Sequence, residues 1–172
     1  MVSNIYKNTF DPYSIALKYK GEQTTYGELD QNVQKYATYF TKIGVKKGDK
    51  IVLSCLNSPE FIYSYLGAIK IGAIIVPVNL LLTFDEIIYI IKNSDAKTMI
   101  FHPTVLEKIK SSKQISKKLA VSLLENIFFE KLIKLFFKIN IIVLNQSFKN
   151  AINKITDYNF EEVDKIKLWK KN

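Results

Sequence analysis

Arginine is absent from this chain of 172 residues, although its formal net charge is +9. All 25 basic residues are lysines, and 15 of them stand in residues 97–172 against 7 acidic residues. Arginine is the residue suited to bidentate contacts with phosphates and base edges, so a surface that carries only lysine is a poor match to a nucleic-acid binder. We therefore expect solvated lysines and no nucleic-acid partner.

Cysteine and histidine occur once each, as Cys55 and His102. One cysteine cannot form an intrachain disulfide, which fits a reducing compartment. A single histidine without a neighbouring cysteine offers neither a conventional metal cluster nor a supported serine triad. We expect Cys55 to be a buried strand thiol and His102 to end a strand, and we predict no metal site.

No glycine follows Gly72. A phosphate-binding loop needs glycines so that successive backbone N–H groups can converge on the anion. Gly44 and Gly72 are predicted to end helices, where the negative end of the dipole repels phosphate. The sequence therefore offers no phosphate cradle, and we predict no cofactor-binding residue in this chain.

Long apolar runs are also missing. No stretch of about 18 uncharged apolar residues occurs, and the N-terminal residues MVSNIYKNTFDPYS lack the apolar core of a signal peptide. We expect a cytoplasmic protein without a transmembrane segment.

What the chain does contain is an alternation of helix and strand patterns. Thr25 to Glu28 reads T-x-x-E, a capping box, and begins a predicted helix that ends at Gly44. Apolar residues recur along it at helical spacing: Leu29, Val33, Tyr36, Phe40 and Ile43.

A β-α-β unit is predicted next. IVLSCL at 51–56 has strand length, Ser58 is placed to cap a helix with Pro59 at its first position, and AIIVPV at 73–78 resembles a parallel strand covered on both faces. The helix between the strands is expected to bury its large apolar side chains: Phe61, Ile62, Tyr65, Leu66 and Ile69.

The alternation then repeats. Thr83 to Glu86 is a second capping box, Ile87, Ile90 and Ile91 mark an apolar face, Asn93 can stop the helix, and KTMIF reads as the next strand. Strands joined by helices of this length favour right-handed crossovers between parallel neighbours. The predicted class is α/β, with a layered, mostly parallel sheet and flanking helices.

Beyond Pro103 the pattern changes. Residues 104–118 are rich in lysine and serine, an amphipathic helix is predicted over 124–136, and INIIVL at 139–144 reads as a further strand. We place one partial domain at 1–146 and a helical or frayed, lysine-rich tail at 147–172.

Four consecutive segments carry a family resemblance: TTYGELDQNVQKYATYF, IGVKKGDKIVL, NSPEFIYSYLGAIKIGAIIVPVN and LLTFDEIIYIIKNSDAKTMIF. In this order they resemble the N-terminal part of AMP-forming acyl-CoA synthetases, within the adenylate-forming ligases, and the match is best over residues 11–101. The resemblance implies a partial N-terminal subdomain of that fold, ending before the phosphate-binding loop.

The resemblance also implies a reaction. Family enzymes join a carboxylate, here expected to be a fatty acid, to ATP as an acyl adenylate and then transfer the acyl group to coenzyme A, with Mg as the metal. The residues that do this in the family lie in later motifs, so this chain is expected to be structural, inactive alone and without a cofactor of its own. A C-terminal catalytic portion or a second chain would then be its partner.

Several side chains allow a second interpretation. Asp85–Glu86 and Glu161–Glu162 are paired carboxylates, but adjacent helical residues point in different directions, and acids at a helix start complement its dipole. Tyr63, Tyr65 and Tyr89 could line an acyl or partner groove, although core packing is the stronger interpretation.

Two alternatives to the ligase fragment are kept. The chain could be a non-catalytic interaction module or one half of a split ligase, since an incomplete α/β layer exposes apolar surface. Less favoured is weak contact of the predicted 124–136 helix with an anionic membrane surface.

Overall fold

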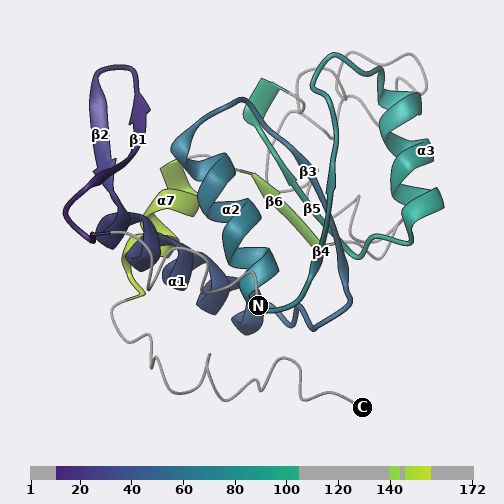
Figure 1. Ribbon diagram of the computed structural model, residues 1–172. Coiled ribbons are helices and arrows are strands. Elements are labelled where there is room, and N and C mark those ends of the chain that lie inside the picture. The colour runs from purple at the N-terminus through teal and green to yellow at the C-terminus, as the bar shows by residue number, and fades with distance from the viewer. Residues whose placement is uncertain (1–10, 105–139, 144–145, 156–172) are drawn as a thin grey trace. The chain divides into compact units, whose positions relative to one another are not determined.

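The structure is a computed structural model, and it describes residues 11–104, 140–143 and 146–155 (Figure 1). The chain forms two compact units. The first takes its residues from Met1–Asp49, Asn57–Ile75 and Lys149–Asn172, and the second from Lys50–Leu56 and Val76–Phe148.

The first unit begins with an antiparallel hairpin of β1 (Ile15–Tyr19) and β2 (Glu22–Thr25). Its turn residues, Lys20 and Gly21, have φ values of 49° and 86°. Positive φ at both positions is the geometry that matches the right-handed twist of two paired strands. This hairpin was not predicted from the sequence.

Three helices belong wholly or mainly to the same unit: α1 (Tyr26–Lys42), α2 (Pro59–Lys70) and α7 (Gln146–Asn153). The predicted starts are confirmed, because Thr25 and Glu28 form both halves of a capping box and Ser58 caps α2. The predicted ends are confirmed as well. Gly44 and Gly72 directly follow the C-caps of α1 and α2, with φ values of 88° and 75°.

The buried face of α2 differs from the prediction. The prediction is wrong for all five large apolar residues, which are half-buried rather than buried. The buried positions of α2 are Ser64, Gly67, Ala68 and Lys70. The reason is the close approach of α1. A Cβ atom at Gly67 would lie 2.9 Å from the Cβ of Tyr36, so only small residues fit at this contact.

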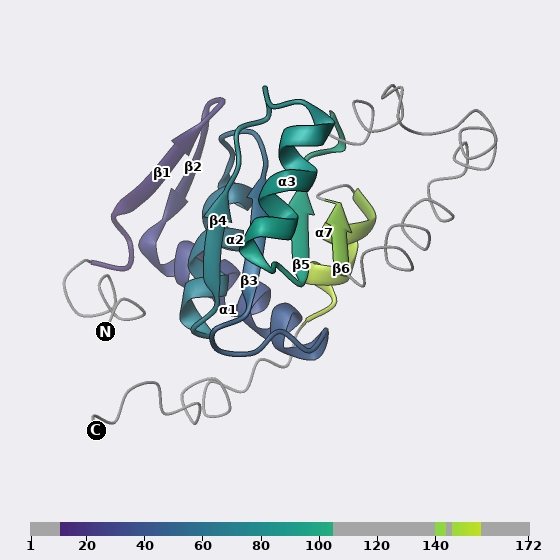
Figure 2. The same cartoon turned by 90° about the vertical axis from the view of Figure 1, so that its right-hand side faces the viewer.

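The second unit contains parallel strands β3 (Lys50–Ser54), β5 (Thr98–Phe101) and β6 (Asn140–Val143), which Figure 2 shows with β5 and β6 side by side. Thr98 pairs in register with Ile51 of β3 and with Asn140 of β6. All four residues of β5 are buried. These pairings confirm the predicted α/β class and the strand expected at 139–144.

Strand β4 (Ile74–Pro77) is an exception to the predicted burial. The sheet order is β4-β3-β5-β6, so β4 is an edge strand, and Ile74 is 49% exposed. Pro77 is exposed too, and a proline without an N–H is tolerated at a sheet edge. The prediction that this strand is covered on both faces is therefore wrong in the described chain.

Helix α3 (Phe84–Ser94) lies on one face of this sheet (Figures 1 and 2). Its capping box of Thr83 and Glu86 is confirmed, and Ile87 and Ile91 are buried. The helix ends at Ser94, and Asp95, two residues after the predicted Asn93, takes the left-handed conformation that stops it, with φ of 53°.

The cap of α3 gives a first test. Thr83→Ala should cost about 1 kcal/mol of unfolding free energy, because the Glu86 N–H loses its bond to the Thr83 hydroxyl and the box is broken. Urea denaturation followed by circular dichroism measures the loss. Thr83→Ser keeps the hydroxyl and should stay close to the parent, whereas equal losses in both variants would contradict the capping role.

Some predictions lie outside the described residues: the helix over 124–136, the Glu161–Glu162 pair and the tail beyond residue 155. Within the described ranges, no helix is long and apolar enough to cross a membrane.

Candidate functional site

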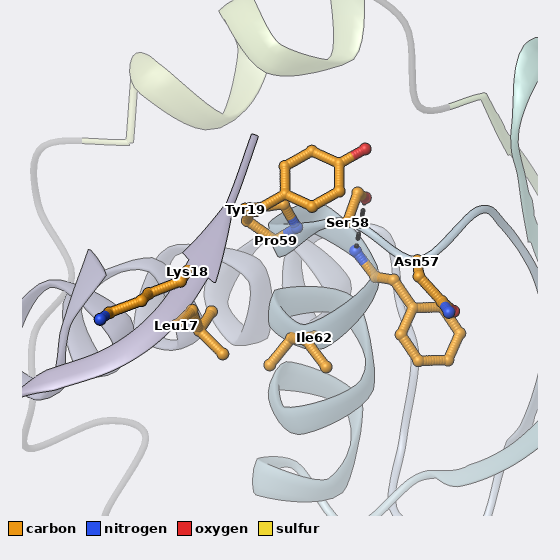
Figure 3. Close-up of a pocket in the computed structure, with 8 residues that line it drawn as sticks. Leu17, Lys18, Tyr19, Asn57, Ser58, Pro59 and Ile62 are labelled. Carbon is orange, nitrogen blue, oxygen red and sulfur yellow. Dashed lines mark hydrogen bonds between the residues drawn. The ribbon is translucent and has the colours of Figure 1, made fainter. Parts of the chain in front are cut away.

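The described part of the first unit has a pocket of about 180 Å³ between strand β1 and the first turn of α2 (Figure 3). Three consecutive residues of β1 and five residues around the start of α2 line it: Leu17, Lys18, Tyr19, Asn57, Ser58, Pro59, Phe61 and Ile62. The hairpin therefore supplies one wall and the capped helix start supplies the other.

The walls are mostly apolar. In Figure 3 the Tyr19 ring lies over Pro59, with Leu17 and Ile62 on either side of the pocket. The Lys18 side chain points away from it. Ser58 is the N-cap of α2, and its hydroxyl oxygen accepts a hydrogen bond from the Phe61 N–H at 3.4 Å. The pocket therefore suits an apolar group.

A hydrogen bond joins the hairpin to α2. The hydroxyls of Thr24 and Tyr63 lie 3.4 Å apart, and the Tyr63 ring packs edge-on against Tyr36 at 5.7 Å. Burial raises the pKa of Tyr63, and this rise outweighs the opposing effect of the Thr24 bond. Tyr63 therefore stays protonated at neutral pH and acts as a structural tie, which agrees with the packing interpretation.

The first turn of α2 also holds an ion pair. Lys149 of α7 contacts Glu60 at 2.5 Å. Burial alone would raise the pKa of Glu60, but the hydrogen bond from Lys149, further hydrogen bonds and the lysine charge together lower it. The pair fastens α7 to α2 and neutralises the only carboxylate in this turn.

Acidification tests this pair. A lowered folded-state pKa means that the ionised Glu60 adds stability above its unfolded pKa and that this contribution is lost as the pH falls through the folded value. Lys149→Ala should therefore flatten the decline in unfolding free energy between about pH 5 and pH 3. Urea titrations at several pH values measure the unfolding free energy, and Lys154→Ala, at an exposed lysine, is the matched control. Parallel curves for both variants would contradict the assignment.

Cys55 and His102 directly follow the carboxyl ends of β3 and β5, respectively, in the second unit. The His102 N–H donates to the Ser54 carbonyl at 2.9 Å, which confirms that His102 ends a strand. Its Nδ1 lies 3.3 Å from the Thr104 backbone nitrogen and 3.0 Å from the Thr104 hydroxyl. Cys55 is half-buried rather than buried, and its thiol donates to the Ile100 carbonyl at 3.7 Å.

The residues considered for a phosphate or metal site lie in the following places. Gly44 and Gly72 are used in helix-ending turns, and the Gly72 carbonyl accepts the Gly48 N–H at 2.8 Å. No group of three or more histidine, cysteine or acidic side chains comes together in the ranges that the structure describes. Asp85 and Glu86 lie in the first turn of α3, where Glu86 accepts the Thr83 N–H at 2.7 Å.

The structure describes the three tyrosines singled out from the sequence, Tyr63, Tyr65 and Tyr89. None of them is among the residues that line the pocket. Tyr65 is half-buried against Phe61, with ring centroids 6.2 Å apart, whereas Tyr89 is 68% exposed. Core packing is therefore wrong for Tyr89, because it lies on the face of α3 away from buried Ile87 and Ile91.

A family model described as AMP-binding enzyme matches residues 8–136. The crotonobetaine/carnitine–CoA ligase of Escherichia fergusonii is 42% identical over 76 residues, which are 44% of this chain and 15% of the relative. A Mycolicibacterium smegmatis protein, the medium/long-chain-fatty-acid–CoA/3-oxocholest-4-en-26-oate–CoA ligase, is 39% identical over 89 residues, 52% of this chain and 16% of the relative. The matches thus span about a sixth of these relatives' lengths.

A solved structure agrees with the fold. The anthranilate CoA ligase AuaEII in complex with anthranoyl-AMP superposes with a TM-score of 0.59 at 26% identity, over 64% of this chain and 21% of that chain. The match to the family model over residues 8–136 confirms the resemblance drawn from the four sequence segments. The chain belongs to the family of AMP-binding enzymes, and it corresponds to the N-terminal part of an AMP-forming acyl-CoA synthetase.

Proposed function

We propose that this chain is the scaffold portion of an ATP-dependent acyl-CoA ligase and that it has no ligase activity alone. Two observations support the proposal: the chain matches only 15% and 16% of two CoA ligases, and Gly44 and Gly72 of the matched segment follow the C-caps of helices. ATP, Mg and CoA would be bound by residues beyond this segment, in the same polypeptide or in a second one.

The names of two relatives support a substrate class for the proposal. One is named for fatty acids of medium and long chain and another for carnitine and crotonobetaine, so the common substrate is a carboxylate. We propose a carboxylate, with a fatty acid as its first candidate, for the whole enzyme. The proposed role of the chain is structural, and in its first unit α7 is fastened to α2 through Lys149 and Glu60. We place the enzyme in the cytoplasm.

Two measurements test the proposal. The purified chain should show no carboxylate-dependent exchange between ATP and pyrophosphate. A chimera in which residues 8–136 replace the matching segment of the Mycolicibacterium smegmatis ligase should regain exchange with that ligase's substrates.

The outcomes separate the alternatives. Exchange by the chain alone would overturn the scaffold role. A chimera that folds, as judged by circular dichroism and gel filtration, but does not activate a carboxylate would favour the non-catalytic interaction module.

A further inference from the structure

We propose that the free edge of β1 and the adjoining pocket form a docking site for an extended, acidic segment of a partner polypeptide. The segment would pair with β1 as a third strand and insert one apolar side chain between Tyr19 and Ile62. This inference goes beyond the scaffold role, and neither depends on the other.

The first support is the topology of the hairpin. β1 and β2 form a sheet of two strands, so the second edge of β1 has no partner strand in the described part of the chain. The backbone N–H and C=O groups along such an edge form a ready template for another extended chain. A two-stranded hairpin is marginal by itself, so a third strand would also add stability.

The second support is the position of the pocket. Leu17, Lys18 and Tyr19 all line it, although the Lys18 side chain points away (Figure 3). The backbone of β1 therefore borders the pocket, and an incoming strand at this edge would have the pocket directly beside it. In strand addition, the backbone bonds give affinity and such side-chain pockets give specificity. A volume of about 180 Å³ suits one bulky side chain and not a whole helix.

The third support is charge. Lys18 and Lys20 are exposed on β1 and its turn, and the positive end of the α2 dipole faces the pocket residues at Ser58 and Pro59. Glu60, the nearest carboxylate of α2, is already paired with Lys149, which leaves Glu22 as the acidic residue within the hairpin strands. A partner segment with carboxylates matches this surface best.

The apolar side chains and the lysine side chain of β1 lie on opposite faces of the strand. Side chains of a strand alternate between its faces, so Leu17 and Tyr19 lie on the pocket side and Lys18 on the other. The matching segment therefore alternates apolar residues toward α2 with acidic residues toward Lys18.

The hairpin is also held in place before any partner arrives. At its base, the Tyr26 N–H donates to the Ser14 carbonyl at 3.0 Å and the Gly27 N–H to the Pro12 carbonyl at 2.9 Å. These contacts fix the segment before β1 to the start of α1, and the Thr24–Tyr63 bond fixes β2 to α2, so binding needs little ordering of the hairpin.

A labelled peptide tests the site on the intact chain. The probe is a fluorescein-tagged, acetylated and amidated heptapeptide in which four aspartates alternate with valine, phenylalanine and valine. We expect a saturable rise in anisotropy, and amide shifts in proton–nitrogen spectra confined to 15–19 and 57–62. Replacing the central phenylalanine by alanine should weaken binding about tenfold. N-methylation of alternate peptide bonds along the pairing edge should abolish binding, because it removes the strand hydrogen bonds.

Two variants with the same change in net charge distinguish binding at this site from a general effect of the protein's charge. Lys18→Glu should weaken binding about fivefold, whereas Lys42→Glu, an equal charge change at the exposed end of α1, should leave it unchanged. Equal weakening by both, or undiminished binding of the N-methylated peptide, would overturn the site. So would a concentration-dependent dimer in sedimentation runs that Lys18→Glu abolishes, because the occupant would then be a second copy. Loss of the peptide site would leave the adenylation tests unaffected.

Discussion

Replacing Gly67 by alanine should destabilise the chain by about 1–3 kcal/mol, even though alanine is a better helix former than glycine. The added Cβ would lie 2.9 Å from the Cβ of Tyr36, 3.1 Å from the Ala37 nitrogen and 3.3 Å from the Val33 carbonyl oxygen. These neighbours are backbone atoms and the first atom of a side chain, so they cannot rotate out of the way. The two helices must separate, which disrupts packing along their whole contact.

The measurement is urea denaturation followed by circular dichroism, with Gly67→Val expected to lose more than Gly67→Ala because it adds more volume at the same contact. Gln31, exposed in α1, gives the matched control. There Gln31→Ala should be near neutral or stabilising and Gln31→Gly destabilising by under about 1 kcal/mol, which isolates helix propensity from packing. A Gly67→Ala variant as stable as the parent would show that α1 and α2 do not approach this closely.

The helix ends and the parallel strands could be predicted because their signals are local. Thr25 and Thr83 form capping boxes within four residues of chain, and Gly44 and Gly72 take positive φ where glycine is favoured. The apolar runs of β3 and β5 indicate burial on both faces, and both strands are central in the sheet. No long-range information is needed for any of these features.

The errors come from features that depend on neighbours distant in sequence. The buried face of α2 is set by how closely α1 approaches Gly67, and a count of apolar residues favours Phe61 and Leu66 instead. AIIVPV has the composition of a central strand, but the sheet order places it at an edge. Hydrophobicity predicts that a segment is buried, but the topology determines which strands and helices it packs against.

The candidate pocket could not be predicted because it depends on the hairpin. The sequence holds only a weak signal for this turn, because Lys20–Gly21 between ALKY and EQTT supplies a glycine but is not one of the usual hairpin dipeptides. Recognising it would have predicted β1 and β2. It would not have predicted the pocket, because the contact between Leu17 and Tyr19 on one side and Pro59 and Ile62 on the other joins segments about 40 residues apart.

Replacing Phe40 by alanine should cost about 3–5 kcal/mol of unfolding free energy, the largest single-residue effect we expect in the first unit. Phe40 has no exposed surface, and its ring packs edge-on against Tyr36 at 6.3 Å and Tyr39 at 6.1 Å. Its truncation removes the ring and leaves a cavity behind, because neither tyrosine can close on the space without leaving its own contacts. Phe40→Leu keeps most of the volume and should cost under about 2 kcal/mol.

Native-state hydrogen exchange shows how far this loss spreads. The chain passes between the two units four times, at Asp49, Leu56, Ile75 and Phe148, and β4 has residues in both. Opening the first unit therefore strains the ends of the second, and the slowest amides of Val52 and Ile100 should lose protection by the same free energy as those of α1. A loss of amide protection confined to α1 and α2 would contradict this coupling. An equal loss of protection in both units would mean that Phe40 stabilises the parallel sheet of the second unit through the connecting chain.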